Sequence, residues 1–191
     1  MQDQINENKT FQKIKHTEAK IQGKEFDDCS FVDCDFSNSH FLRCRFANCE
    51  FVGCNMSMVK FNGTGLTDVA FKNCKLLGIN FSDCEDFMFS VAFEKCVLDY
   101  CSFMGKKMVK TKFSDSSMKN MVFTEANLTQ AVFSRTDLDG TLFSQTLLKE
   151  ADFTTAINYA IDPALNLVKK AKFSLYGLPG LLTRYDINVQ E

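Results

Sequence analysis

Large apolar residues recur every five positions along most of this chain. One series runs from Phe26 to Phe81, and a second runs from Phe93 to Phe153. Neither a helix, with its period of 3.6 residues, nor a strand, with its period of 2, generates a period of five. A smaller residue lies two positions before each large one, and all nine cysteines belong to this smaller class. The pattern predicts an interior with a small and a large slot that repeat every five residues.

Positions twenty residues apart form columns of the same residue type. If the segment between Phe81 and Phe93 is taken to contain two extra residues, one column is entirely phenylalanine: Phe31, Phe51, Phe71, Phe93, Phe113, Phe133, Phe153 and Phe173. The column opposite is also phenylalanine: Phe41, Phe61, Phe81, Phe103, Phe123 and Phe143. At their clear positions after Phe46, the two columns between them hold only Leu or Met: Met56, Leu76, Leu98, Met118 and Leu138 in one, and Leu66, Met108, Leu128 and Leu148 in the other. Stacking levels at the interstrand spacing of about 4.8 Å predicts a rod of roughly 34 Å from Phe31 to Phe173.

Three segments carry the repeat most clearly: Ala126-Asn127-Leu128, Thr136-Asp137-Leu138 and Ala151-Asp152-Phe153. Over about residues 26–173 the chain resembles the pentapeptide-repeat family, whose motif is roughly A-(D/N)-(L/F)-x-x. The resemblance implies an all-β fold, a right-handed quadrilateral β-helix with a short C-terminal helical cap. We expect an irregular opening coil at residues 1–25, the β-helix at 26–173 with a two-residue register shift near 84–92, and a helix and strand cap at 174–191.

The run from Ile161-Asp162-Pro163 to Lys172-Phe173-Ser174, together with the leucine-rich tail that follows, resembles the end of quinolone-resistance (Qnr-type) pentapeptide-repeat proteins. Leucines after Ser174 share one face of a short predicted helix, and Tyr185–Val189 alternates like a short strand. In the Qnr-type family this module forms a symmetric dimer, so the resemblance implies a homodimer through Leu175, Leu178, Leu181, Leu182 and Tyr185. A cap on a monomer is the alternative.

Candidate chemistry is sparse. The two histidines, His16 and His40, accompany no nucleophile elbow, phosphate loop or paired-carboxylate signature. The cysteines form a parallel ladder rather than converging C-x2-C pairs, so we interpret them as reduced apolar filler. We therefore expect no enzyme activity, no cofactor and no metal. Lys106 departs from the pattern because it falls in an inward slot, and we expect its ammonium to reach solvent at a corner.

Charge is the remaining signal. Formal net charge is −2, which argues against direct nucleic-acid binding. The first twenty residues are polar and no run approaches about 18 apolar residues, so we expect a cytoplasmic protein without a membrane segment. A basic patch is predicted at Lys107, Lys110, Lys112 and Lys119. The candidate partner-binding patch is acidic: Glu25, Asp27, Asp28, Asp33 and Asp35.

Two functions fit this sequence. The first is a scaffold that binds a partner protein through its outer faces. The second follows from the Qnr-type resemblance: a rod that imitates DNA, binds DNA gyrase or topoisomerase IV, and protects them from fluoroquinolones. Duplex DNA carries one charge per about 1.7 Å, or roughly twenty over this rod. A net charge of −2 suits that mimicry poorly.

Overall fold

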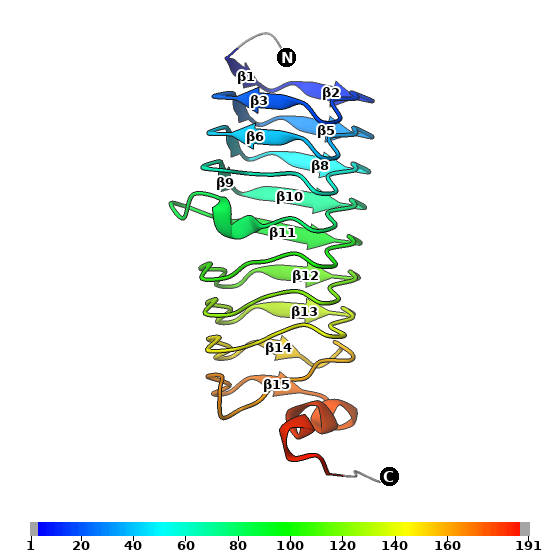
Figure 1. Cartoon of the computed structure of the whole chain (residues 1–191), viewed down its shortest axis with the longest axis vertical. Helices are drawn as coiled ribbons and strands as arrows, with labels where there is room; N and C mark the ends of the chain where they lie inside the picture. The colour runs from blue at the N-terminus through cyan, green and yellow to red at the C-terminus, as the bar shows by residue number, and fades with distance from the viewer. Residues whose placement is uncertain (1–3, 188–191) are drawn as a thin grey trace.

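The computed structural model describes residues 4–187, which form a rod of stacked coils with the first strand, β1, at one end and the C-terminal turns at the other (Figure 1). Five residues form one side of a coil and four sides complete a turn, so Phe31 pairs with Phe51 and Phe51 with Phe71. These pairings are parallel. The fold is the right-handed quadrilateral β-helix that the resemblance to the pentapeptide-repeat family implies.

The rod has four sides, which we call faces A to D in the order in which the chain visits them. Faces A and C are therefore opposite each other, as are B and D. The inward column of face A is Asn6, Phe26, Phe46, Leu66, Met108, Leu128, Leu148 and Val168. Its N-terminal half is the sheet β1 (Ile5–Glu7), β4 (Glu25–Asp27), β7 (Arg45–Ala47) and β9 (Gly65–Thr67). Its C-terminal half is a ladder of single bridges through Lys107, Asn127, Leu147 and Leu167.

Face B is a nine-stranded sheet that runs the length of the rod. Its strands are β2 (Thr10–Gln12), β5 (Ser30–Val32), β8 (Glu50–Val52), β10 (Val69–Lys72), β11 (Val91–Glu94), β12 (Lys112–Ser114), β13 (Val132–Ser134), β14 (Asp152–Phe153) and β15 (Lys172–Phe173). Face C, whose inward column includes Phe36 and Met56, is a ladder of single bridges from Lys15 to Ile157. Face D carries the Phe41 column, β3 (Lys20–Gln22), β6 (His40–Leu42) and the 3-10 turn η1 (Phe81–Asp83).

The corners of the coil require an unusual backbone. At most corners the second residue after the large one has a left-handed conformation, as at Asp28 (φ 48°), Asn48 (φ 52°) and Gly53 (φ 66°). Gly, Asn and Asp adopt this conformation at little cost, which explains their frequency there. Met58 and Tyr100 adopt it as well, at φ 59° and 62°.

The core confirms the predicted columns. Phe31 stacks on Phe51 with ring centroids 4.6 Å apart, and across the register shift Phe71 stacks on Phe93 at 5.3 Å. The two phenylalanine columns also touch each other edge to face, as Phe93 and Phe103 do at 5.9 Å. Stacked and T-shaped contacts are the arrangements that aromatic rings favour.

Most residues in the small slots that carry a hydrogen-bond donor donate it to a backbone carbonyl of the preceding coil. The Thr64 hydroxyl donates to the Phe41 carbonyl at 2.9 Å, and the Cys54 thiol donates to the Phe31 carbonyl at 3.3 Å. All nine cysteines are free and buried. They are thus more than the apolar filler that the sequence indicated, because most of them also act as weak donors to backbone carbonyls.

The opening segment has a regular backbone and an irregular interior. Asn6 pairs with Phe26, Phe11 with Phe31, and Ile21 with Phe41, all twenty residues apart. We expected an irregular coil before residue 26. What is irregular is the filling, because Asn6 and His16 take large slots that hold apolar residues elsewhere in the rod.

The cap consists of two 3-10 helices, η2 (Leu175–Leu181) and η3 (Thr183–Tyr185). The Ser174 hydroxyl accepts a hydrogen bond from Gly177 N at 3.1 Å and starts η2. The strand expected over 185–189 does not begin at Tyr185, which ends η3. Asp186 then adopts a left-handed conformation at φ 49°. Asn188 and Val189 lie outside the described residues.

Candidate interaction surface

The register shift produces a bulge of residues 85–90 on face A, halfway along the rod beside β11 (Figure 1). Phe71 and Phe93 stay paired across it although 22 residues separate them. Ser90 N rejoins the coil by donating to the Leu66 carbonyl at 2.9 Å. Phe87 at the tip is 79% exposed, whereas Phe89 packs back against the core. The bulge therefore adds residues outside without displacing any column inside.

Lys106 anchors the bulge. Its side chain is only 2% exposed, so the expectation that it reaches solvent is wrong. The ammonium donates to Asp86 Oδ1 and to the Cys84 carbonyl, both at 2.6 Å, and lies 5.1 Å from the Phe89 ring centroid. Burial of an ammonium is costly unless it is paired and hydrogen-bonded. Here the bulge supplies a carboxylate, a carbonyl and an aromatic face, so Lys106 stabilises the bulge from inside.

The structure does not gather the five predicted acidic residues on one surface. Glu25 and Asp27 flank Phe26 on face A, and Asp28 forms the corner between faces A and B. Asp33 forms the next corner, and Asp35 lies on face C in the ladder with Lys15 and Asn55. The five residues thus surround one coil instead of forming one patch.

The predicted basic residues are also divided among faces. Lys107 and Lys110 lie on face A, and Lys112 lies in β12 on face B. Lys119 lies on face C, where its ammonium pairs with Asp137 Oδ2 at 3.0 Å.

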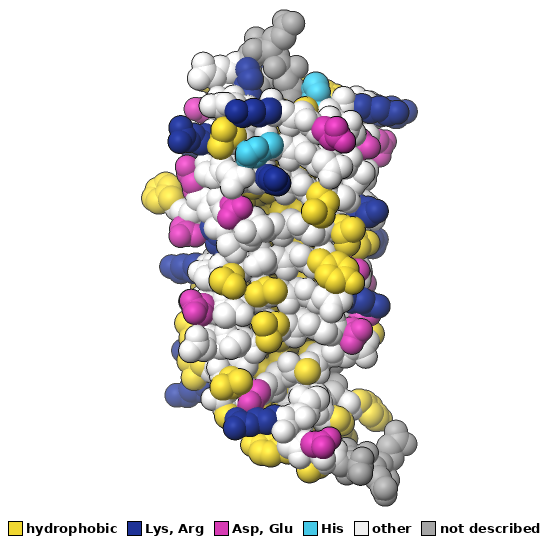
Figure 2. Space-filling model, in the orientation of Figure 1, with side chains coloured by type: hydrophobic (Ala, Val, Ile, Leu, Met, Phe, Trp, Pro, Cys, Tyr) yellow, Lys and Arg dark blue, Asp and Glu magenta, His cyan; other side chains and the backbone are white. Residues whose placement is uncertain are grey.

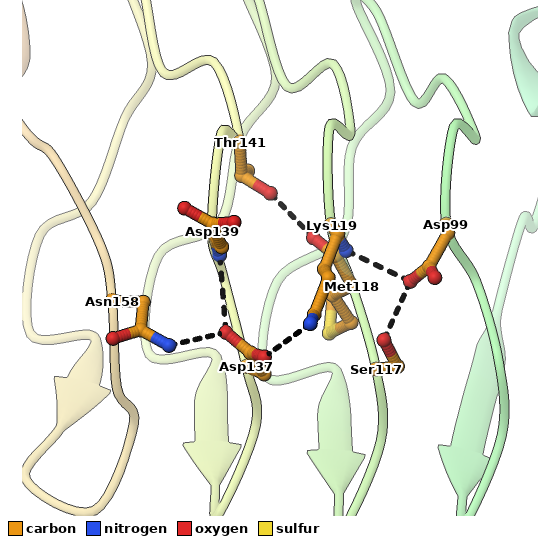
Figure 3. Close-up of polar contacts among 8 residues, drawn as sticks. All are labelled: Asp99, Ser117, Met118, Lys119, Asp137, Asp139, Thr141 and Asn158. Carbon is orange, nitrogen blue, oxygen red and sulfur yellow. Dashed lines mark hydrogen bonds and ion pairs between the residues drawn. The ribbon is translucent and has the colours of Figure 1, made fainter.

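Face C carries a polar ladder in its C-terminal half (Figure 3). Asp99 Oδ1 accepts hydrogen bonds from the Ser117 hydroxyl at 2.6 Å and from Lys119 N at 2.9 Å. Two levels beyond Asp99, Asp137 Oδ1 accepts from Asn158 Nδ2 at 2.8 Å. These carboxylates bind groups on the next coil, so they join coils together and are not free for a ligand.

Hydrogen bonds lower the pKa of two carboxyl groups on face C, those of Asp35 and Asp137. Partial burial opposes the ionisation of Asp137, but donors on Asn158 and Lys119 outweigh it and lower the pKa of its carboxyl. Hydrogen bonds from the Ser37 backbone and hydroxyl lower the pKa of Asp35. Both side chains are therefore fixed anions at neutral pH.

Exposed apolar residues gather where faces C and D meet, in the middle of the rod. Figure 2 shows them below the two histidines on this side of the molecule. We call this surface the apolar edge: the exposed residues Met58, Val97, Tyr100, Met104 and Leu142, with the half-buried Leu77 and Val122. Tyr100 is 64% exposed and Met58 52%. Sequence reasoning missed this edge, although its members are apolar residues at outward positions of consecutive repeats.

The expected dimer residues lie in the cap with different exposures. Leu175, Leu178 and Tyr185 are exposed, Leu182 is half-buried, and Leu181 packs against the core. Tyr176, which we did not predict, is 90% exposed, more than any other large hydrophobic residue within 4–187.

Reactive side chains are scarce on the outer surface. Burial raises the pKa of Cys49, Cys84 and Cys101 to about 12. Within residues 4–187, no three His, Cys, Asp or Glu side chains are grouped to hold a metal ion. In the same range, no helix is long and apolar enough to cross a membrane.

The square coil and its columns define a β-solenoid. The family models that match this sequence describe repeats of the same kind. A pentapeptide repeat region model matches residues 24–86, and a model of eight pentapeptide repeats matches 107–145 and 126–157. The chain belongs to the pentapeptide-repeat family.

Solved structures of a fluoroquinolone resistance protein share the fold. Full-length QnrB1, described as plasmid-mediated, is similar with a TM-score of 0.65 and 16% identity, over 93% of this chain and 100% of QnrB1. A trypsin-treated variant of QnrB1 is similar with a TM-score of 0.51 and 22% identity, over 98% of this chain and 92% of the other. No curated protein sequence matches the chain.

Proposed function

We propose that the protein is a non-enzymatic scaffold that binds a partner protein along the apolar edge. The observation that carries the proposal is the run of apolar side chains over consecutive coils, in which the exposed Met58, Tyr100 and Leu142 are linked by the half-buried Leu77 and Val122. Contiguous apolar patches on a soluble protein mark interaction sites, whereas isolated apolar residues do not. Tyr and Met are also enriched in protein interfaces.

The form of the rod supports the same proposal. Its ladders hold each outward side chain at a fixed height, about 4.8 Å from the equivalent residue on the next coil. A partner therefore meets a preformed surface and orders few side chains on binding, which favours affinity. All nine thiols are buried, and the two histidines lie on different faces, His16 on face C and His40 on face D. The outer surface is therefore better suited to binding than to catalysis.

Photo-cross-linking in a native lysate tests the apolar edge. A double variant, Tyr100→Glu with Met104→Glu, places two charges on the edge and should lose the cross-linked partner at least tenfold. The matched control places two charges on face B, as Gln12→Glu with Asn73→Glu, where both residues are exposed. The control should retain the partner. Equal recovery by wild type, control and double variant would refute the proposal.

A Qnr-like function is the second candidate, and the shared fold with full-length QnrB1 favours it. In this reading the rod binds DNA gyrase or topoisomerase IV as an imitation of DNA and protects it from fluoroquinolones. A net charge of −2 and the lysines of face A count against it. The test is gyrase supercoiling with ciprofloxacin, with and without the protein. Protection at micromolar protein supports this candidate, and no protection and no gyrase binding removes it.

A further inference from the structure

Face A is acidic in one half and basic in the other. The exposed acids between its N-terminal end and the bulge are Glu7, Glu25, Asp27, Asp28, Asp68, Glu85 and Asp86. The exposed lysines beyond the bulge are Lys107, Lys110, Lys149, Lys169 and Lys170. Among the outward positions of the face, one residue in each half has the opposite charge, Arg45 in the first and Glu150 in the second. The two ends of the face therefore carry opposite charge.

Most of this basic charge is not neutralised within the rod. Lys149 approaches Glu150 at 3.6 Å. In residues 4–187 the other four lysines, Lys107, Lys110, Lys169 and Lys170, form no ion pair. Face B differs, because there acids and bases pair between neighbouring coils, as Lys72 does with Glu50 and Lys172 with Asp152.

We propose that face A binds a second copy of this chain, antiparallel, about a twofold axis near the bulge. A surface with one acidic and one basic half is complementary to itself when it is turned end to end. A twofold interface applies each contact twice, so the acidic half of each copy meets the basic half of the other. A parallel arrangement would place like charges opposite each other, which is unfavourable.

The levels of the rod match this arrangement in detail. Four levels of the face A column precede the bulge and four follow it, so that a twofold axis at the bulge pairs the outermost levels with each other. The pairing places Glu7 opposite Lys169, Asp27 opposite Lys149, and Asp68 opposite Lys110, while in these levels Asp28 at the corner is the one acid that meets another acid, Glu150. The one cationic level in the acidic half, that of Arg45, meets the uncharged level of Asn127, so no cation meets a cation.

Apolar residues occupy matching places on the same face. Ile5 in the outermost acidic level is exposed, and so is Leu167 in the level that would meet it. Phe87 and Met88 of the bulge are exposed beside the proposed axis, where they would meet their own copies. Interfaces commonly combine a central apolar contact with a charged periphery.

The size of the face sets the strength of the dimer. Nine levels at about 4.8 Å and a width of roughly 13 Å give about 500 Å² per copy. The total of about 1,000 Å² is at the lower limit for a specific interface. Exposed ion pairs each contribute little and are screened by salt. The dimer should therefore form at micromolar concentrations in low salt and dissociate at about 0.5 M salt.

Sedimentation equilibrium of two charge-reversed variants tests the proposal. The first variant, Glu7→Lys with Asp27→Lys, reverses two charges of the acidic half, and the second, Lys149→Glu with Lys169→Glu, reverses the two lysines that meet them. Each alone should dimerise at least tenfold more weakly than wild type in 20 mM salt. An equimolar mixture of the two should form a heterodimer, because the reversed faces are complementary.

Control variants distinguish a dimer through face A from a dimer through another surface. Lys20→Glu with Lys60→Glu reverses two exposed charges on face D in the same part of the rod and should leave dimerisation unchanged. Circular dichroism checks that every variant is folded. A wild type that stays monomeric at 300 µM in 20 mM salt would overturn the proposal. So would variants that dimerise as tightly as wild type, since the dimer would then use the cap or another face. These outcomes are independent of partner binding at the apolar edge.

Discussion

Lys106 and Asp86 form one ion pair, but they contribute unequally to stability. Lys106 is buried, whereas Asp86 is 87% exposed. If the carboxylate is removed, a buried ammonium keeps only a carbonyl and an aromatic face as partners. If the lysine is removed, the remaining carboxylate is simply hydrated. Removing the exposed partner is therefore the more damaging change.

We predict that Asp86→Ala lowers the free energy of unfolding by about 2–3 kcal/mol, a value reduced from that of a fully buried pair because solvent screens Asp86. Lys106→Met, which fills the slot with an apolar chain of similar length, should cost about 1 kcal/mol or less. Urea unfolding measures both, and Glu85→Ala in the same bulge is the control, with a change within about 0.5 kcal/mol. A larger loss for Lys106→Met than for Asp86→Ala would contradict this account of the pair.

The sequence predicted single residues well where the repeat alone decides their environment. Phe31, Phe51 and Phe71 stack as the period requires. The prediction failed for Lys106 because its partners lie in the one segment that breaks the repeat. It was incomplete for Cys54, because a spacing pattern identifies a small slot but not the carbonyl within reach of the thiol.

The cap exposes several large apolar side chains. Leu175 is 77% exposed and Tyr176 90%, at one end of the rod. We predict that Leu175→Glu with Tyr176→Glu abolishes any end-to-end dimer and shifts the mass measured by light scattering toward the monomer. The change should leave the thermal unfolding midpoint within a few degrees, since neither side chain is in the core. A cap that only closes a monomer would instead show no change in mass.

An element could be predicted from the sequence where the five-residue repeat determines it, and not where contacts between distant segments do. The columns and the level count follow from a period that is repeated many times, and the sequence predicted them. The cap has no repeat, and its leucines fit an α-helix as well as they fit the 3-10 turns that form around Pro179. The acidic residues are close in sequence, but a coil of twenty residues turns Glu25 and Asp35 to opposite faces. The apolar edge was missed because its members are close only after the chain has wound.

Several carboxylates give the whole rod a common response to acid. The pKa is lowered by hydrogen bonds or nearby cations for Asp35, Asp115, Asp137, Glu150 and Asp152. A lowered pKa means that the folded state holds fewer protons than the unfolded state in acid, so this contribution is present at neutral pH and lost as pH falls. Their ordinary values are 3.8 for Asp and 4.5 for Glu.

We therefore predict a urea midpoint that is nearly constant from pH 7 to about 5 and falls below about pH 4.5. Asp137→Asn should lower stability at pH 7 and reduce the further decrease between pH 4.5 and 3, because one of the carboxylates no longer titrates. Unfolding monitored by circular dichroism at each pH provides the measurement. A variant whose acid decrease equals that of wild type would show that Asp137 does not contribute.

Each level of the rod touches only the levels directly above and below it, which determines how the molecule would respond to a pulling force. Stretched between its ends, such a chain unspools one turn after another, starting from whichever end is less well secured. The unfolding force would then show a series of small, similar peaks instead of one large peak. The turn fastened by Lys106 should stand out in that series as a stronger step near the middle.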